Sequence, residues 1–319
     1  MTALPKGRLG AALGQCRAVT ERHAKTFSLA ALLLPRELRA ACYAVYAFCR
    51  RADDSVDSAP DEATARSALA ASREQLRRAF APGGLDDPDP EVAALAWAFR
   101  SHGVLRPPLE HLLDGMALDL TPLRLQAWPE LNRYCVLAAG TVGRALAPAL
   151  GAAPEAADAA EALGVAMQLT NILRDVAADA ALGRVYLAAD ELAAAGLTQQ
   201  QLVEAARAGS HTGPAGLPAF LDGQIERARE WYARAEPGIA QIASWRSRLC
   251  VRAMGVLYGE ILAVLEEQGR DPFRGRARVS LWRKLWLAAA CVFGRRLPHP
   301  REQIARLPIV WTQPRQVDK

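Results

Sequence analysis

The sequence predicts an almost entirely α-helical protein. Alanine and leucine, which favour helices, dominate the chain, and aromatic residues make up only 6% of it. β-branched residues rarely alternate with polar ones, so the two-residue period of half-buried strands is scarce. Alanine-rich runs at 152–163 and 176–195 have good helix composition. We therefore expect helices joined by loops, without a sheet.

Clusters of proline, glycine and aspartate mark where the expected helices end. We expect interhelical loops at 81–90, 105–108, 121–122, 209–218 and 269–278. None of these is long or polar enough to separate two cores, so we expect a single domain over residues 1–319. Within that domain, we expect residues 1–15 to be flexible and residues 297–319 to form an irregular tail.

Two pairs of aspartates indicate a divalent-metal site. Asp53 and Asp57 follow an apolar stretch, and so do Asp175 and Asp179; both segments lack glycine and proline and therefore belong on helices. Four residues make about one helical turn, so each pair projects its carboxylates from one face, roughly 6 Å apart along the axis. Such like charges repel unless a cation bridges them. Mg²⁺ suits carboxylates that leave coordination positions open for water and phosphate oxygens.

A solvated helix face is the alternative interpretation of one such pair, because acidic residues at this spacing are common on surfaces. Here the same arrangement occurs twice, and each pair has an arginine nearby. Arg50 lies one turn before Asp53, and Arg174 directly precedes Asp175. Metal-bound diphosphate between two facing helices accounts for the acids and the bases together.

Cysteine usage and the N-terminus suggest a cytoplasmic protein. The six cysteines show no CxxC spacing and lie mostly among apolar neighbours, which argues against a disulfide framework or a zinc site. The N-terminal residues lack the apolar region and the cleavage site of a secretory signal. The apolar run 285–293 is far shorter than the ~20 residues that span a bilayer.

The segment 282–296 leaves two interpretations open. It carries Trp282 and Trp286 in a chain of formal net charge +5. Its basic residues are Arg283, Lys284, Arg295 and Arg296. Peripheral association with the inner surface of an anionic membrane is one interpretation, and a core helix with basic ends is the other. Nucleic-acid binding is not expected, because the basic residues are dispersed among acids without a recognised motif. The sequence leaves the oligomeric state open.

Several motifs together resemble the squalene/phytoene synthase family, whose members join two prenyl diphosphates head to head. The motifs that carry the resemblance are 23–27 with 32–35, 46–57, 113–120, 134–143, 168–187 and 276–285. The last of these is similar to bacterial phytoene synthases in particular. The resemblance implies an all-α isoprenoid-synthase fold, with a central active-site cavity, aspartates at its mouth and a lipid channel below.

The resemblance also implies roles for individual residues. Mg²⁺, with Mn²⁺ as an alternative, would be held by Asp53, Asp57, Asp175 and Asp179, with Asn171 within reach. The diphosphate oxygens would accept hydrogen bonds from Lys25, Arg50, Arg174 and Arg184, and Asn171 is also a candidate to bind them. Tyr186 would position the departing diphosphate, or else cap a helix end as a buried tyrosine. Asp114 and Asp119 would lie behind the metal ligands. Three residues depart from the family pattern, in which Glu, an aromatic residue and Pro are usual: Ala178, Val136 and Ala188.

The implied reaction is the Mg²⁺-dependent condensation of two geranylgeranyl diphosphates, through a cyclopropyl diphosphate intermediate, to phytoene in carotenoid biosynthesis. Ala30 and Ala31 leave room for the longer chain, although Tyr43 could refill it. No glycine-rich nucleotide motif is present, so NADPH is not expected, which disfavours a reductive squalene synthase. The alternatives are a dehydrosqualene or presqualene (hopanoid-type) synthase that uses farnesyl diphosphate, and a non-catalytic family member acting as an assembly protein.

Overall fold

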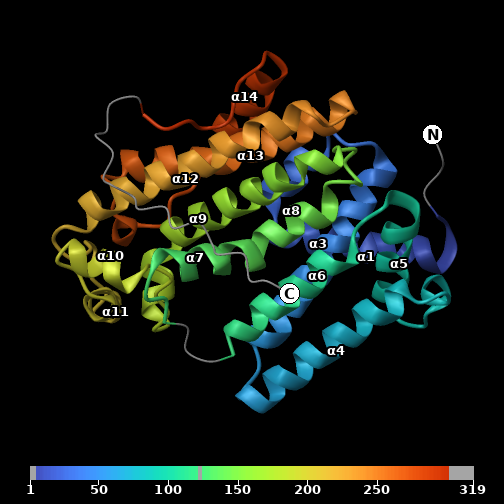
Figure 1. The fold of residues 1–319 in the computed structure, drawn as a ribbon, viewed down its shortest axis with the longest axis horizontal. Coiled ribbons are helices and arrows are strands. Elements are labelled where there is room, and N and C mark those ends of the chain that lie inside the picture. The colour runs from blue at the N-terminus through green and yellow to red at the C-terminus, as the bar shows by residue number, and fades with distance from the viewer. Residues whose placement is uncertain (1–4, 121–123, 302–319) are drawn as a thin grey trace.

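A computed structural model describes residues 5–120 and 124–301 of the protein. It is 74% helical, and the described residues contain no strand beyond one isolated bridge between Ala152 and Ile242 (Figure 1). The prediction of an all-α fold is therefore confirmed.

The helices are numbered along the chain. The first seven are α1 (Gly7–His23), α2 (Lys25–Ala31), α3 (Arg36–Asp57), α4 (Glu62–Phe80), α5 (Pro90–His102), α6 (Arg106–Leu118) and α7 (Trp128–Cys135). The others are α8 (Thr141–Leu146), α9 (Ala157–Ala181), α10 (Ala189–Ala194), α11 (Gln199–Arg207), α12 (Leu217–Ala240), α13 (Trp245–Glu267) and α14 (Leu281–Val292). Short 3₁₀ helices span Gly84–Asp86, Pro154–Ala156 and Pro272–Arg274, and a π-helical turn spans Val136–Gly140.

Most of the predicted interhelical loops are confirmed, with one exception. The loops 81–90, 209–218 and 269–278 all separate helices. The segment 105–108 differs, because Pro107 and Pro108 lie in the first turn of α6. Proline is tolerated there since the first turn leaves its backbone N–H groups without helical partners. The predicted loop 121–122 lies outside the described residues.

The expectation of a flexible N-terminal segment is wrong for residues 7–15. These residues form the first part of α1, because Ala12 and Leu13 are buried against the core. Residues 1–4 and 302–319 lie outside the described part. Residues 297–301 are not helical, as expected for the tail.

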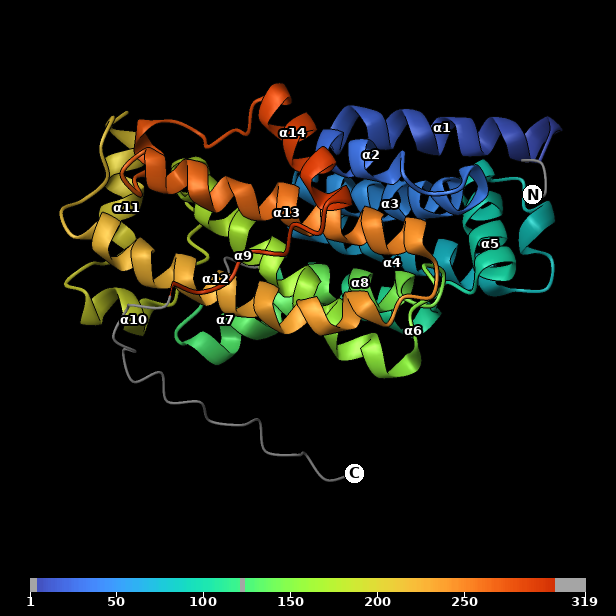
Figure 2. The same cartoon turned by 90° about the horizontal axis from the view of Figure 1, so that it is seen from above.

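Helix α9 occupies the middle of the molecule, between α12 and α13 on one side and α7 and α8 on the other (Figures 1 and 2). Glycines allow its neighbours to approach closely. A Cβ atom on Gly143 would lie 2.2 Å from the carbonyl oxygen of Ala160, and one on Gly164 would lie 2.4 Å from that of Ala139. The sequence therefore sets the close contact of α9 with α8 and with the π-helical turn.

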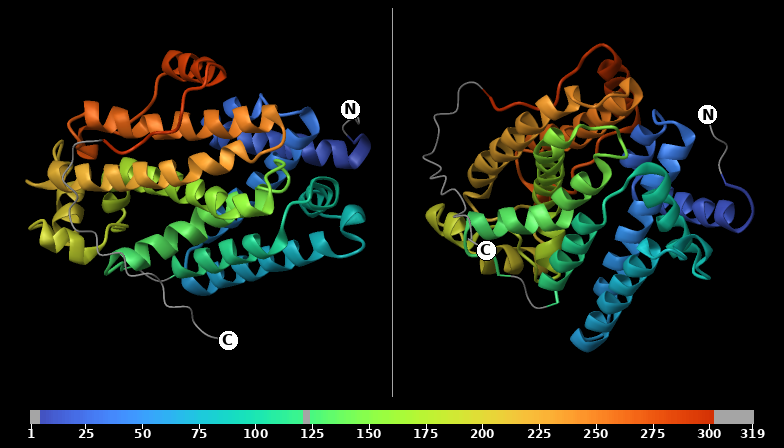
Figure 3. Two further views of the ribbon diagram at one scale, coloured as in Figure 1. Left: turned by 45° about the horizontal axis from the view of Figure 1, so that its top comes forward. Right: turned by 45° about the vertical axis from the view of Figure 1, so that its right-hand side comes forward.

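The buried apolar side chains from α1 to α14 form one continuous cluster. No helix in the described part of the chain is long and apolar enough to cross a membrane. Helix α14 packs on the outer side of α13 (Figures 2 and 3).

Candidate active site

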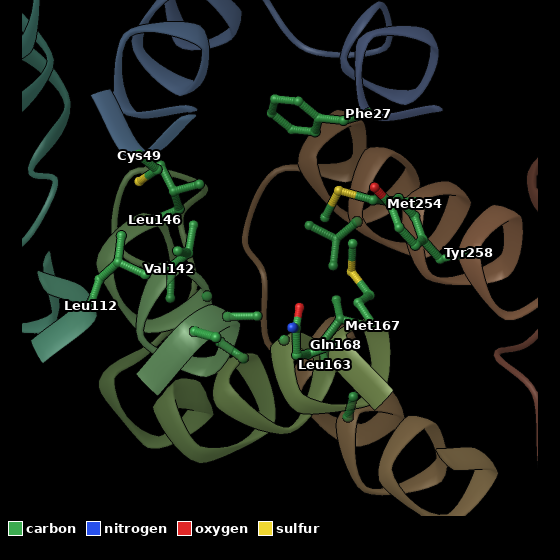
Figure 4. A pocket seen from close by; sticks show the side chains of 18 of the residues that line it. Phe27, Cys49, Leu112, Val142, Leu146, Leu163, Met167, Gln168, Met254 and Tyr258 are labelled. Carbon is green, nitrogen blue, oxygen red and sulfur yellow. The ribbon is translucent and has the colours of Figure 1, made fainter. Parts of the chain in front are cut away.

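A cavity of about 450 Å³ lies between α3, α6, α8, α9, α12 and α13. Its charged and amide lining side chains are those of Arg50, Asp53, Asp119, Gln168 and Asn171, and we call this part of the lining the rim. Below the rim the walls are apolar: Leu112, Val142 and Leu146 face Met254 and Tyr258 across the cavity (Figure 4). Ala152 and Ile242, which form the isolated bridge, line its far end. The predicted central cavity is thus present; of the four paired aspartates, Asp53 lines it, whereas Asp57, Asp175 and Asp179 are not among its lining residues.

The expectation that Ala30 and Ala31 deepen the cavity is wrong. Both residues are buried in α2, but neither lines the cavity, and Tyr43 does not line it either. The space arises instead from small residues on the helices around it. These lining residues are Gly115, Ala138, Ala139, Gly143, Ala147, Ala156, Ala159, Ala160, Gly164, Ala235 and Gly238.

The first aspartate pair lies at the C-terminal end of α3. Arg50 donates to Asp53 Oδ2 over 3.2 Å and forms an ion pair with Asp54 at 2.5 Å, so it is shared between two acids. Burial, followed by the negative charge of Asp57, raises the pKa of Asp53 to about 6. This carboxylate is therefore only partly neutralised by the protein.

The second pair lies near the C-terminal end of α9. Asp175 accepts two hydrogen bonds from Arg174 and two from Arg276, the latter at 2.7 and 3.0 Å. Burial acts to raise the pKa of Asp175, but these hydrogen bonds lower it overall. Burial and the charge of Asp175 raise the pKa of Asp179 to about 6, and this carboxylate has no hydrogen bond or ion pair within the described residues.

The turn after α9 connects the two pairs. Gly183 adopts a φ of +78°, which glycine tolerates best, and the chain reverses there. The backbone N–H of Arg184 donates to the carbonyl of Asp179, and its side chain reaches α3, where it pairs with Asp57 at 3.1 Å. The C-terminal end of α3 and the turn after α9, which are far apart in the sequence, are thereby joined.

The structure separates the two remaining acidic candidates. Asp119 lines the cavity, accepts a hydrogen bond from the Tyr134 hydroxyl at 3.4 Å, and has its pKa raised to about 6 by burial. Asp114 points elsewhere and pairs with Arg73 on α4. Tyr186 does not line the cavity; it stacks on Tyr134 with ring centroids 5.1 Å apart.

Basic side chains from α2, α9 and α14 lie near one another beside Asp175, outside the cavity lining. Lys25 is exposed at the start of α2. Lys284 of α14 donates to Thr26 over 2.8 Å, and burial together with the charges of Lys25 and Arg174 lowers its pKa. Sequence reasoning missed Lys284 and Arg276 as site residues. The basic motif 276–285 was the signal, but spacing alone does not bring it next to α9.

The four aspartates fit a metal bound jointly with substrate. In the described residues, no three acidic, histidine or cysteine side chains converge on one metal position. Each pair therefore offers two carboxylates at most and leaves positions open for water and diphosphate oxygens. Burial, followed by the charge of the other aspartate of the pair, raises the pKa values of Asp53 and Asp179, and a bound cation would lower both.

A model of the squalene/phytoene synthase family matches residues 20–283. The chain belongs to the squalene/phytoene synthase family. It is 38% identical over 290 residues to the 15-cis-phytoene synthase of Synechococcus elongatus, covering 87% of this chain and 91% of that relative. It is 39% identical over 284 residues to a chloroplastic phytoene synthase of Daucus carota, covering 87% and 69% respectively.

Solved structures of related enzymes share the fold. A dehydrosqualene synthase, crystallised with a ligand, has a TM-score of 0.80 at 28% identity, covering 89% of this chain and 96% of that one. A squalene synthase of Alicyclobacillus acidocaldarius has a TM-score of 0.72 at 29% identity, covering 83% and 96%. The predicted isoprenoid-synthase helical fold is therefore confirmed. The squalene/phytoene synthase family uses prenyl diphosphates and generally depends on divalent metal ions.

Proposed function

We propose that this enzyme is a phytoene synthase of carotenoid biosynthesis, which joins two geranylgeranyl diphosphates head to head through a cyclopropyl diphosphate intermediate. The observation that carries the proposal is 36–39% identity to phytoene synthases over most of the chain. An apolar cavity with an acidic and basic mouth supports it, since the substrate pairs a long hydrocarbon chain with a charged diphosphate.

We assign the metal to the two pairs, Asp53 with Asp57 and Asp175 with Asp179, and place Asn171 beside the second pair. Mg²⁺, or Mn²⁺ as an alternative, would neutralise the leaving diphosphate there so that the allylic C–O bond can break. The position of Asn171 on the cavity wall supports this assignment.

We assign diphosphate binding to Lys25, Arg50, Arg174 and Arg184. The three arginines already contact the aspartates of both pairs, at Asp53, Asp57 and Asp175. Their planar guanidinium groups can donate two hydrogen bonds each to phosphate oxygens, whereas Lys25 contributes a point charge. Tyr186, through its stacking on Tyr134, acts as a positioning residue for the diphosphate end of the site.

The cavity walls keep water from the carbocations of the reaction. Below the rim they are almost entirely apolar, which disfavours bound water. The rings of Phe27, Tyr46 and Tyr258 also line the cavity, and aromatic faces attract cations.

A second candidate function is the condensation of two farnesyl diphosphates. The dehydrosqualene synthase and the squalene synthase with similar structures favour it. A non-catalytic assembly role fits less well, because both aspartate pairs are present with arginines beside them, and Asp53 and Arg50 line the cavity.

Product analysis tests these alternatives. Purified protein is incubated with Mg²⁺ and either geranylgeranyl or farnesyl diphosphate, without and then with NADPH, and the lipid extract is analysed by mass spectrometry. We expect a C40 triene from geranylgeranyl diphosphate without NADPH. A C30 product would support the second candidate, or a reductive squalene synthase if it required NADPH. No product from either substrate would favour the assembly role.

Two features of organisation accompany this proposal. The continuous buried cluster from α1 to α14 supports a single domain. The exposed apolar side chains of α14 support peripheral association with the inner surface of a membrane. A cytoplasmic location stays a prediction from the sequence.

A further inference from the structure

Helix α14 turns its apolar side chains outward. Of the ten large hydrophobic residues that are exposed in the described part of the chain, six lie between positions 281 and 293. We call these six the apolar face of α14: Leu281, Trp282, Leu285, Trp286, Val292 and Phe293. Trp282 is 82% exposed and Phe293 is 90% exposed. The alternative of a core helix with basic ends is therefore wrong.

The outward orientation is held by specific contacts. Leu287 and Cys291, on the opposite side of the helix, are buried. Arg283 pairs with Glu260 and Glu267 of α13 at 2.7 and 2.8 Å. Turning the apolar face inward would break these ion pairs. Because a concentration of exposed apolar side chains is unfavourable in water, it usually marks a surface that binds something.

The charges around this face favour an anionic occupant. The segment 276–301 contains no acidic residue. Arg278 and Arg296 flank α14, are exposed, and make no hydrogen bond or ion pair within residues 5–120 and 124–301. Arg295 lies over the Trp286 ring, 5.4 Å from its centroid. Tryptophan side chains bordered by basic residues are typical of helices that lie in the headgroup region of a bilayer.

The same helix borders the mouth of the cavity. Lys284 contacts Thr26, which precedes the cavity-lining Phe27. The loop before α14 supplies Arg276, which binds Asp175. A surface that binds α14 would therefore lie close to the site where substrate enters.

We propose that the apolar face of α14 docks on an anionic lipid bilayer, with Trp282, Trp286 and Phe293 inserted at headgroup level and Arg278 and Arg296 against lipid phosphates. The docking proposal rests on the proposed function in one respect: the substrate and product of the proposed reaction carry long apolar chains, which partition into bilayers. Docking lets them pass between the bilayer and the cavity mouth.

Vesicle sedimentation tests the proposal. The full chain is mixed with vesicles of phosphatidylcholine alone or of phosphatidylcholine with phosphatidylglycerol. We expect binding to the anionic vesicles and its loss in the triple variant Trp282→Ser/Trp286→Ser/Phe293→Ser. Arg278→Gln and Arg296→Gln should each weaken binding about fivefold. Trp245→Ser, which removes an exposed tryptophan at the start of α13, should leave binding unchanged.

Two further measurements separate docking from folding and from catalysis. Circular dichroism and product formation from detergent-dispersed substrate should be the same in the triple variant and the wild type. If the wild-type protein formed no product from detergent-dispersed substrate, the proposed function would be contradicted. The vesicle result would still test docking. The docking proposal would be overturned if the wild-type protein did not bind anionic vesicles. It would also be overturned if ultracentrifugation showed a dimer that the triple variant abolishes, because a second copy of the chain would then cover α14.

Discussion

At the residue scale, the paired aspartates are neutralised unequally. Asp175 receives two arginines, Asp53 shares Arg50 with Asp54, and Asp179 receives none among the described side chains. As a result, the pKa values of Asp53 and Asp179 are raised, whereas the pKa of Asp175 is lowered. Each pair can thus gain stability from a cation.

Substitution of one acid in each pair tests their role. We expect Asp53→Asn and Asp175→Asn each to lower the turnover rate by about a hundredfold or more, because each removes a charged metal ligand. Helical content should stay the same. Asp114→Asn is the matched control, since Asp114 pairs with Arg73 away from the cavity. Near-wild-type turnover in both Asp53→Asn and Asp175→Asn would rule out the metal assignment.

Arg276 gives a second prediction at this scale. Its two hydrogen bonds to Asp175 place a guanidinium group at the position where diphosphate oxygens are expected. We expect Arg276→Gln to raise the KM for prenyl diphosphate about tenfold, because a charge-assisted contact is lost. Arg276→Lys should recover only part of that loss, since lysine lacks the planar fork. Steady-state kinetics decide the matter, and an unchanged KM in Arg276→Gln would exclude substrate contact. Arg274→Gln, in the same loop, is the control.

The raised pKa values predict a pH-dependent response to metal. Burial raises the pKa values of Asp53, Asp119 and Asp179 to about 6 from 3.8, so the folded state binds more protons than the unfolded state between these values. Without metal, the free energy of unfolding should therefore fall as the pH rises through this window. Mg²⁺ competes with these protons, so it should raise Tm at about pH 7.5 and much less at about pH 5. Thermal melts with NaCl of equal ionic strength are the control, and equal shifts at both pH values would contradict the prediction.

At the element scale, local sequence predicted helices better than it predicted contacts. The segments that carry Asp53 and Asp175 are helical as expected, because apolar runs without glycine or proline have few alternatives. Proline patterns misplaced the start of α6, since Pro107 suits a first helical turn as well as a loop. Arg276 and Lys284 could not be assigned to the site, because tertiary packing alone brings their segment beside α9 and α2.

The glycines of α9 and α12 give a prediction at the same scale. We expect Gly164→Ala to destabilise the protein by about 1–3 kcal/mol, because the new Cβ would lie 2.4 Å from the carbonyl oxygen of Ala139. Gly223→Ala on α12 is the matched control, since its Cβ would meet nothing within 4 Å. There, lower backbone entropy in the unfolded chain should stabilise the protein by about 0.5–1 kcal/mol. Chemical denaturation that gave both variants the same stability would show that α9 can move away from the π-helical turn.

At the scale of the whole molecule, the cavity exists because small residues on several helices leave space between them. Alanine and glycine line it on α8, α9 and α12, and the bridge between Ala152 and Ile242 borders its far end. The sequence predicted a cavity through resemblance, but attributed its depth to Ala30 and Ala31, which pack elsewhere. Depth is a property of several helices together and cannot be read from one of them.

The far end of the cavity should therefore select the length of the substrate. Ala160 lines it, eleven residues or roughly 16 Å along α9 from Asn171 at the rim. We expect Ala160→Phe to lower kcat/KM for geranylgeranyl diphosphate about tenfold or more while farnesyl diphosphate is still accepted, because the ring fills space that only the longer chain reaches. Ala157→Phe, on the same helix but outside the cavity lining, should leave the ratio of kcat/KM for geranylgeranyl diphosphate to kcat/KM for farnesyl diphosphate unchanged. Mass spectrometry of products from each substrate gives the ratio directly. An equal loss of kcat/KM with both substrates would mean that the ring disturbs the reaction centre. The far end of the cavity would then not select substrates by chain length.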